Sequence, residues 1–249
     1  MKPHKLKLYS GLLLSIFLLS GCSISLYDLK SVDNSKDFYK GKEITYKEDN
    51  NYSSNASYEY QSGNKFAFFV EVENLTDKPV VFHPENIYCM QLNANKEALQ
   101  TGEPNMLYAI DPEVKIKQTK VELENNENRH SFNTGLNATF GLISIFAHVA
   151  DDKNNNKLGS VGDDVANWSI NQSNENAFYE SRKDKILSKS EFWEQEVLRK
   201  TTLYKNDSTG GLVFVPFNKD AEYIELVVPI GDKQHVYLFR KIEIKQRSN

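Results

Sequence analysis

The residues with the spacing of a metal site lie between positions 152 and 163, in the run Asp-Lys-Asn-Asn-Asn-Lys-Leu-Gly-Ser-Val-Gly-Asp. Oxygen-bearing side chains fall at positions 1, 3, 5, 9 and 12 of this run, as in a calcium-binding loop. The candidate ligands are Asp152, Asn154, Asn156 and Asp163. However, Lys157 occupies the position that needs glycine for a sharp turn, and Asp163 replaces a bidentate glutamate. These departures favour the alternative, a solvated loop between two helices, so no metal site is predicted and the four residues remain a weak calcium candidate.

Other residue types that commonly do chemistry show no recognisable pattern. No histidine after the N-terminal segment lies three or four residues from another histidine or from a cysteine, so no local zinc motif is present. These histidines are His83, His130, His148 and His235. The chain also has no Gly-x-Ser-x-Gly motif, no glycine-rich phosphate loop and no dinucleotide fingerprint. We therefore predict no catalytic residue and no cofactor.

Cys89 and a group of three tyrosines can each be interpreted in two ways. Cys89 lies in a predicted strand, where we expect a small buried hydrophobic residue; a reactive thiol is the alternative. Residues 48–64 are polar and are predicted to form a loop that carries Tyr52, Tyr58 and Tyr60. Tyrosine combines a rigid ring with a hydroxyl, so these side chains could stack on a sugar or a protein partner. The alternative is that they decorate an exposed edge.

The N-terminal residues have the layout of a secretory signal. Three lysines lie within the first seven residues, an apolar run follows over residues 11–19, and the small residues Ser20 and Gly21 come next. The apolar run is too short to cross a bilayer, which needs about 20 residues. We predict a signal peptide over residues 1–21.

The residues Leu19, Ser20, Gly21 and Cys22 resemble the lipobox of bacterial lipoproteins. This resemblance implies cleavage before Cys22 and a diacylglycerol on its thiol, which would anchor the chain to a membrane, because paired acyl chains hold stably. Ser23 stands where similar lipoproteins retained at the inner membrane have aspartate, which favours the outer membrane. No acidic run follows Cys22, which favours a periplasm-facing orientation over a surface one.

The length and composition of the rest of the chain limit its domain number, its possible partners and its disulfides. Of the 249 residues, 228 would remain after cleavage, enough for one large domain or two small ones. The net charge is −4 with both signs mixed throughout, so no basic field for nucleic acid is present. With Cys22 lipidated, Cys89 has no cysteine with which to form a disulfide.

Two blocks of strands are predicted, one at each end of a single domain over residues 42–249. Residues 22–41 are polar and aperiodic, and we interpret them as a lipidated tether. Phe66, Phe68, Val70 and Val72 alternate with more polar residues, which indicates a strand with one buried face. Further strands are predicted at 80–83, 87–92, 212–215, 224–230 and 236–244, with a hairpin at 231–234. Neither block is large enough alone, so the two should pair into an antiparallel β-sandwich of about seven strands.

A helical insertion is predicted between the blocks, at about residues 105–200. Asp111 followed by Pro112 is typical of a helix start, and that helix could run to about Asn125. A second, apolar helix should begin near Asn133 and be buried on the sheet or its neighbours. Ser188 and Glu191 have the spacing of a capping box, which predicts another helix start.

The order of elements is similar to that of immunoglobulin-like domains in bacterial envelope lipoproteins. The residues that carry this resemblance are Phe68–Asn74, Leu198–Leu203 and Gly211–Pro216. The resemblance implies a mainly β, immunoglobulin-like sandwich and transfers no functional residues; the long helical insertion departs from the compact members.

Two functions remain at this point. The first is a lipid-anchored, non-catalytic module of the bacterial cell envelope that binds a protein or glycan partner at the membrane surface. The second is an envelope hydrolase with its site between the helical insertion and the sheet. A pocket with converging Asp, Glu or His would favour the hydrolase, and an apolar surface patch would favour the binding module.

Overall fold

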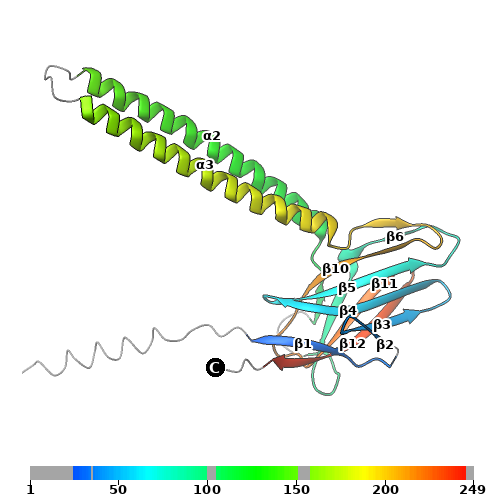
Figure 1. Cartoon of the computed structure of the whole chain (residues 1–249). Helices are drawn as coiled ribbons and strands as arrows, with labels where there is room; N and C mark the ends of the chain where they lie inside the picture. The colour runs from blue at the N-terminus through cyan, green and yellow to red at the C-terminus, as the bar shows by residue number, and fades with distance from the viewer. Residues whose placement is uncertain (1–24, 35, 100–104, 151–157, 245–249) are drawn as a thin grey trace, which may run out of the picture.

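The fold is described from a computed structural model over residues 25–34, 36–99, 105–150 and 158–244. The side chains of Lys36 and of residues 135–150 and 158–172 lie outside the description. The described chain is mainly β, with antiparallel sheets and two long helices (Figure 1).

Two five-stranded sheets form the β-body. The first has the order β1 (Leu26–Ser31), β12 (Lys233–Ile244), β11 (Tyr223–Ile230), β7 (Tyr88–Leu92) and β8 (Met106–Tyr108). The second has the order β10 (Ser208–Pro216), β5 (Lys65–Asn74), β4 (Tyr52–Ser62), β3 (Lys42–Glu48) and β2 (Lys36–Tyr39). A two-stranded sheet pairs β6 (Val80–Phe82) with β9 (Thr201–Leu203), and the 3₁₀ turn η2 (Pro84–Asn86) leads into β7.

Alternating side chains on β5 show how the sequence forms the core. Phe68 is fully buried, whereas its neighbour Phe69 is 37% exposed, because successive side chains of a strand point to opposite faces. The predicted buried face of Phe66, Phe68, Val70 and Val72 is confirmed. Across the core, Phe68 contacts Phe239 of β12 with 5.2 Å between ring centroids, so the two sheets pack face to face.

The predicted hairpin between β11 and β12 is also confirmed. Gly231 has φ of +58°, a conformation that glycine adopts without a steric cost, and it follows the last residue of β11 directly. The two strands then pair in register from Tyr223 opposite Arg240 to Ile230 opposite Lys233.

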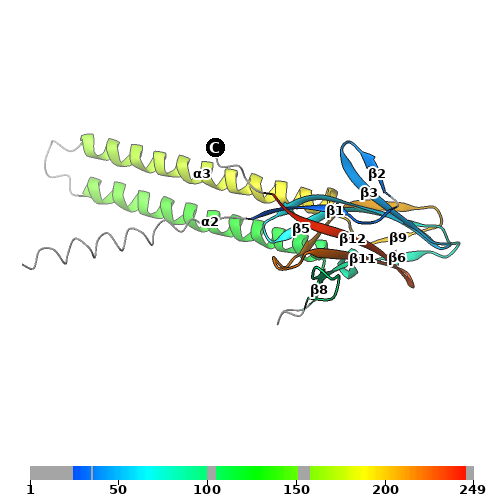
Figure 2. The ribbon, with the colours of Figure 1, turned by 90° about the horizontal axis from the view of Figure 1, so that it is seen from below.

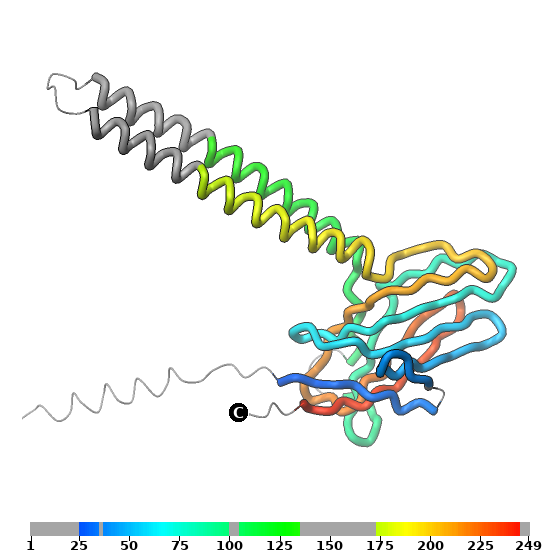
Figure 3. Tube along the Cα trace, in the orientation of Figure 1, coloured from blue at the N-terminus to red at the C-terminus, as the bar shows by residue number. Residues whose placement is uncertain are grey.

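The predicted tether over residues 22–41 is corrected by the structure. Residues 26–31 form β1, which pairs with β12, and residues 36–39 form β2, which pairs with β3. Figure 3 shows the two ends of the described chain side by side. Among the described residues of this segment, Leu29 is the one apolar side chain that is fully buried in the core, so the segment looks polar in sequence. Ser31 is also buried, with its hydroxyl hydrogen-bonded to that of Thr45.

The predicted loop over residues 48–64 is also wrong, because most of it is β4, an inner strand between β3 and β5. Its alternation is hidden by small polar residues. Ala56 and Tyr52 are buried, and Ser54 is buried with its hydroxyl hydrogen-bonded. Such strands in polar segments explain why the described residues contain twelve strands where about seven were predicted.

The helical region consists of two continuous helices, α2 (Pro112–Ala150) and α3 (Leu158–Gln195). The start at Asp111 is confirmed, since its Oδ1 accepts hydrogen bonds from the backbone N–H groups of Glu113 and Val114. The predicted end near Asn125 and the predicted start at Ser188 are wrong. Residues 163–187 contain neither glycine nor proline, so nothing in the sequence ends the helix before Ser188.

Figures 1 and 2 show α2 and α3 side by side as a hairpin that projects away from the sheets. A helix of 39 residues is about 58 Å long. The hairpin contacts the β-body at its base, and α2 lies against α3 rather than along a sheet, the second of the two predicted arrangements for this region. The side chains of the apolar stretch from residue 135 onward lie outside the description.

Candidate binding groove at the base of the hairpin

The end of α3 is tied to the edge of a sheet by backbone hydrogen bonds. Leu198 N donates to Leu212 O at 2.9 Å, and Leu212 N donates to Glu196 O at 2.8 Å. Gly211 makes this approach possible, because a Cβ at that position would lie 2.7 Å from Leu198 N. The last turn of α3 is thereby held over the outer face of β10.

The start of α2 is fixed to the same strand. Ile110 N donates to Phe214 O at 2.9 Å, two residues before α2 begins. Both legs of the hairpin are therefore attached to β10, one at Leu212 and the other at Phe214.

Aromatic side chains from three elements gather around Phe214. Trp193 and Phe192 of α3 lie 5.6 and 5.9 Å from its ring centroid, and Tyr60 of β4 lies 6.3 Å away. Their tilted and edge-on geometries are those that aromatic pairs favour. This cluster lies on the opposite face of β5 and β10 from the main core.

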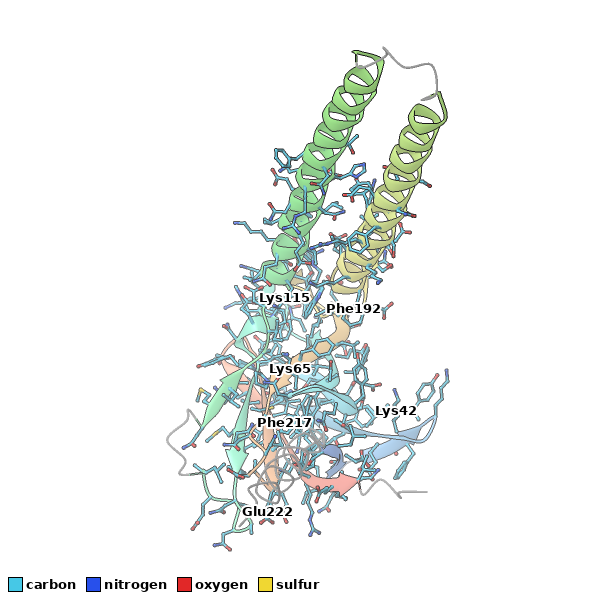
Figure 4. All side chains as sticks on the ribbon, turned by 90° about the vertical axis from the view of Figure 1, so that its left-hand side faces the viewer. Lys42, Lys65, Lys115, Phe192, Phe217 and Glu222 are labelled. Atoms are coloured by element: carbon cyan, nitrogen blue, oxygen red, sulfur yellow. The ribbon has the colours of Figure 1, made fainter. Side chains whose placement is uncertain are left out.

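The cluster lines a groove of about 310 Å³, which we call the hairpin groove. It is lined by Tyr60, Ser62, Lys65, Ile110, Lys115, Lys189, Phe192, Trp193 and Phe214. Figure 4 shows Lys115 and Phe192 at the base of the two helices and Lys65 farther down on the β-body. Pockets of this size that combine aromatic walls with a few polar groups are typical of ligand sites.

Its ionisable groups are lysines and one tyrosine. Lys189 Nζ lies 2.9 Å from Glu122 Oε2, an exposed ion pair. Lys115 Nζ donates to Gln118 Oε1 at 2.9 Å and Lys65 Nζ to Asn64 Oδ1 at 3.3 Å. Burial raises the pKa of Tyr60, and the negative charge of Glu59 adds to this shift. The groove thus presents ammonium groups and a protonated phenol beside aromatic rings, an arrangement that attracts negative charge.

A second cluster has the residue types of a serine hydrolase triad but lies inside the core. Ser54 Oγ on β4 lies 2.6 Å from His235 Nδ1 on β12, and it also shares a hydrogen bond with the Tyr237 hydroxyl. Asp49 Oδ2 lies 3.5 Å from His235 Nε2. Ser54 and His235 are only 5% and 6% exposed, so the hydroxyl cannot reach a substrate without separation of the sheets. We interpret Ser54, His235 and Tyr237 as a set of buried hydrogen-bonding groups that links the two sheets, and we call this set the polar tie.

Asp49 lies next to the polar tie, and its surroundings favour the ionised carboxylate. Burial raises its pKa, but hydrogen bonds from Asn51 N, Tyr52 N and His235 outweigh that effect, so the pKa of Asp49 lies below its ordinary value.

The sequence-predicted site residues fall in different places. Leu19, Ser20, Gly21 and Cys22 lie outside the described residues, as do Asp152, Asn154 and Asn156; Asp163 is in α3, but its side chain is not described. In the ranges that are described, no group of three or more His, Cys, Asp or Glu side chains could hold a metal ion.

The remaining candidates are mostly structural. Cys89 is buried as predicted, and burial raises the pKa of its thiol, which opposes thiolate formation. His83 Nδ1 lies 2.9 Å from Glu85 Oε1, and His130 stacks on Tyr179 at 3.9 Å. His148 is in α2, and its side chain is not described.

Of the three tyrosines considered as possible stacking platforms or as decoration of an exposed edge, Tyr60 alone lines the hairpin groove. Tyr52 is in the core, and Tyr58 packs against Phe66 and Phe68. The lysines of the groove come from β5, α2 and α3, so no local spacing in the sequence could have brought them together.

Over the residues described, no helix combines the length and the hydropathy needed to cross a membrane. Comparisons of the chain with protein-family models, with curated proteins and with solved structures found no match in any of the three.

Proposed function

We propose that this chain is a lipid-anchored, non-catalytic binding protein of the bacterial cell envelope, with the hairpin groove as its binding site. We further propose that its facing sheets form an immunoglobulin-like sandwich and that the hairpin is an insertion between two strands. The observation that carries the binding role is the groove itself, with four aromatic side chains and three lysines in one lining.

The groove supports binding more directly than catalysis. Rigid aromatic side chains bury a large area at a small cost in conformational entropy, which is why they dominate binding sites. A hydrolase site at the same place, the alternative, would draw its acid and base from lysine and tyrosine. The carboxylates and imidazoles that usually transfer protons in hydrolysis do not line this groove.

The proposed anchor at Cys22 supports a role at the membrane surface. Three residues separate Cys22 from Leu26, the start of β1, so the two positions are at most about 14 Å apart along the chain. With the acyl chains in the membrane, the β-body would sit directly on its surface, and a partner in the groove would be held nearby. This proposal extends to the outer membrane, with the body facing the periplasm.

The binding role is tested by recovery of partners from envelopes solubilised in mild detergent. The bait would be the full chain, its Trp193→Ala variant, and a Phe132→Ala variant as a matched control. Phe132 is 66% exposed on α2 and does not line the groove. A partner recovered by the full chain and by Phe132→Ala, but not by Trp193→Ala, supports the proposal. Equal recovery by all three, or Trp193-dependent hydrolysis of an envelope component, would overturn it.

A further inference from the structure

We infer that the ligand of the hairpin groove is an acidic glycan chain, whose sugar rings stack on the aromatic side chains and whose carboxylates or phosphates face the lysines. This inference rests on the proposed binding role and names the class of ligand. Three features of the groove support it.

The first feature is the filled edge of the sheet, which disfavours an extended peptide. β10 is an edge strand, the usual place for a peptide to add as a further strand. Here the backbone of Leu212 is already hydrogen-bonded to residues 196 and 198, and Phe214 O accepts from Ile110 N. A ligand at this place must therefore be recognised by side chains rather than by backbone pairing.

The second feature is the aromatic lining. The face of an aromatic ring carries partial negative charge and attracts the weakly positive C–H groups that a pyranose ring presents on one side. Trp193, Phe192 and Tyr60 all contact Phe214, so several rings are available within one groove. Ser62 adds a hydroxyl that can pair with sugar hydroxyls.

The third feature is the distribution of positive charge. Lys115 comes from α2, Lys189 from α3 and Lys65 from β5. Figure 4 labels Lys115 and Lys65. Lys189 is ion-paired with Glu122, whereas Lys115 and Lys65 donate to the neutral side chains of Gln118 and Asn64. In a chain with a net charge of −4, Lys65 and Lys115 therefore give the groove a local positive charge. Charges supplied from separate elements suit a ligand with repeated negative groups. Three lysines are too few for the long basic track that nucleic acid requires.

The test is calorimetric titration of the full-length protein in neutral detergent with tetragalacturonic acid and with its methyl ester. The two probes share ring size and differ in charge. We expect the acid to bind at least about tenfold more tightly than the ester at low salt, with the difference shrinking as salt screens the lysines. The Lys65→Met/Lys115→Met variant should lose about tenfold in affinity for the acid and most of its salt dependence.

Matched controls keep the outcomes distinct. Trp193→Ala should weaken binding of the acid by about tenfold, whereas Lys78→Met, at an exposed turn away from the groove, and Phe132→Ala should leave it within about twofold. Equal affinity for acid and ester, or an unchanged Lys65→Met/Lys115→Met variant, overturns the inference. So does tighter, Trp193-dependent binding of a hexa-aspartate peptide or of phosphatidylglycerol vesicles, although the groove would then still be a binding site. If Trp193→Ala alters neither this titration nor recovery from envelopes, the proposed function fails as well.

Discussion

Trp193, in the last turn of α3, packs against Phe214 of β10 with 5.6 Å between their ring centroids and 55° between their planes. This contact joins the projecting hairpin to the outer face of a sheet whose other face lines the main core. Backbone hydrogen bonds hold both legs of the hairpin beside β10, and two residues of this attachment, Ile110 and Phe214, also line the groove.

Replacement of Phe214 should therefore weaken both attachment and folding. Its ring is buried under Trp193 and Phe192, so Phe214→Ala is expected to lower the free energy of unfolding by about 3–5 kcal/mol. Chemical denaturation followed by circular dichroism measures the change. The matched variant Phe132→Ala removes an exposed ring and should stay within about 0.5 kcal/mol. Equal effects of the two would show that the packing at the hairpin base contributes nothing.

The polar tie between the sheets predicts a graded loss of stability. Ser54→Ala leaves both His235 Nδ1 and the Tyr237 hydroxyl without their shared partner, which should cost about 1–3 kcal/mol. Tyr237→Phe leaves the Ser54–His235 hydrogen bond in place and should cost about 1 kcal/mol. Urea unfolding of both variants measures these costs.

The neighbouring residue supplies the control for the tie. The Ser53 hydroxyl donates to Glu73 Oε2 at 3.0 Å in a partly exposed position, so Ser53→Ala should change stability by less than about 0.5 kcal/mol. A Ser54→Ala variant as stable as Ser53→Ala would mean that the buried tie does not hold the sheets together. Esterase activity that depends on Ser54 would contradict its structural assignment.

Alkaline pH should destabilise the fold partly through Tyr58. Burial, with a smaller contribution from the negative charge of Asp28, raises the pKa of Tyr58 to about 12. The folded protein thus holds this proton more tightly than the unfolded chain, whose tyrosines have a pKa of about 10. The stability it contributes is complete below pH about 10 and is lost as the pH rises toward 12.

The urea midpoint of Tyr58→Phe should consequently fall less steeply between pH 10 and pH 12 than that of the unaltered chain. Tyr39→Phe, at an exposed position of β2, is the control and should keep the original slope. A Tyr58→Phe slope identical to that of the unaltered chain would contradict the burial argument.

The sequence was most informative where side chains alternate strongly. Phe66 to Val72, the turn at Gly231 and the cap at Asp111 follow from local chemistry alone, and all three were predicted correctly. It was least informative where burial depends on a distant partner. Ser54 on β4 can be buried in the core because its hydroxyl forms hydrogen bonds with His235 and Tyr237, which lie far along the chain.

The helix boundaries and the groove likewise could not be predicted from local sequence alone. The Ser188–Glu191 spacing is typical of a helix start. The same residues can also lie on the exposed side of a longer helix, because no helix-breaking residue directly precedes them. Phe192 and Trp193 are adjacent in the sequence, but their contact with Phe214 depends on Gly211 and on the path of residues 196–198 beside β10.

The proposed lipid anchor makes a prediction that is independent of the groove. Cells that express the unaltered chain should incorporate labelled palmitate into it, and the protein should fractionate with membranes. Cys22→Ser should abolish both, because the proposed anchor is attached to the sulfur of Cys22. Cys89→Ala removes the other cysteine, which is buried in the core, and should keep the label. Label retained by Cys22→Ser, or never present in the unaltered chain, would exclude the anchor.

The binding role of the hairpin groove is tested most directly by photo-cross-linking in intact envelopes. p-Benzoylphenylalanine would replace Phe192 in one variant and the exposed Phe132 in another, so that the same probe lies inside and outside the groove. We predict a discrete adduct on irradiation of the variant with the probe at position 192 and none from the variant with the probe at position 132. No adduct at position 192, or equal adducts at both positions, would contradict the assignment of the groove as the binding site.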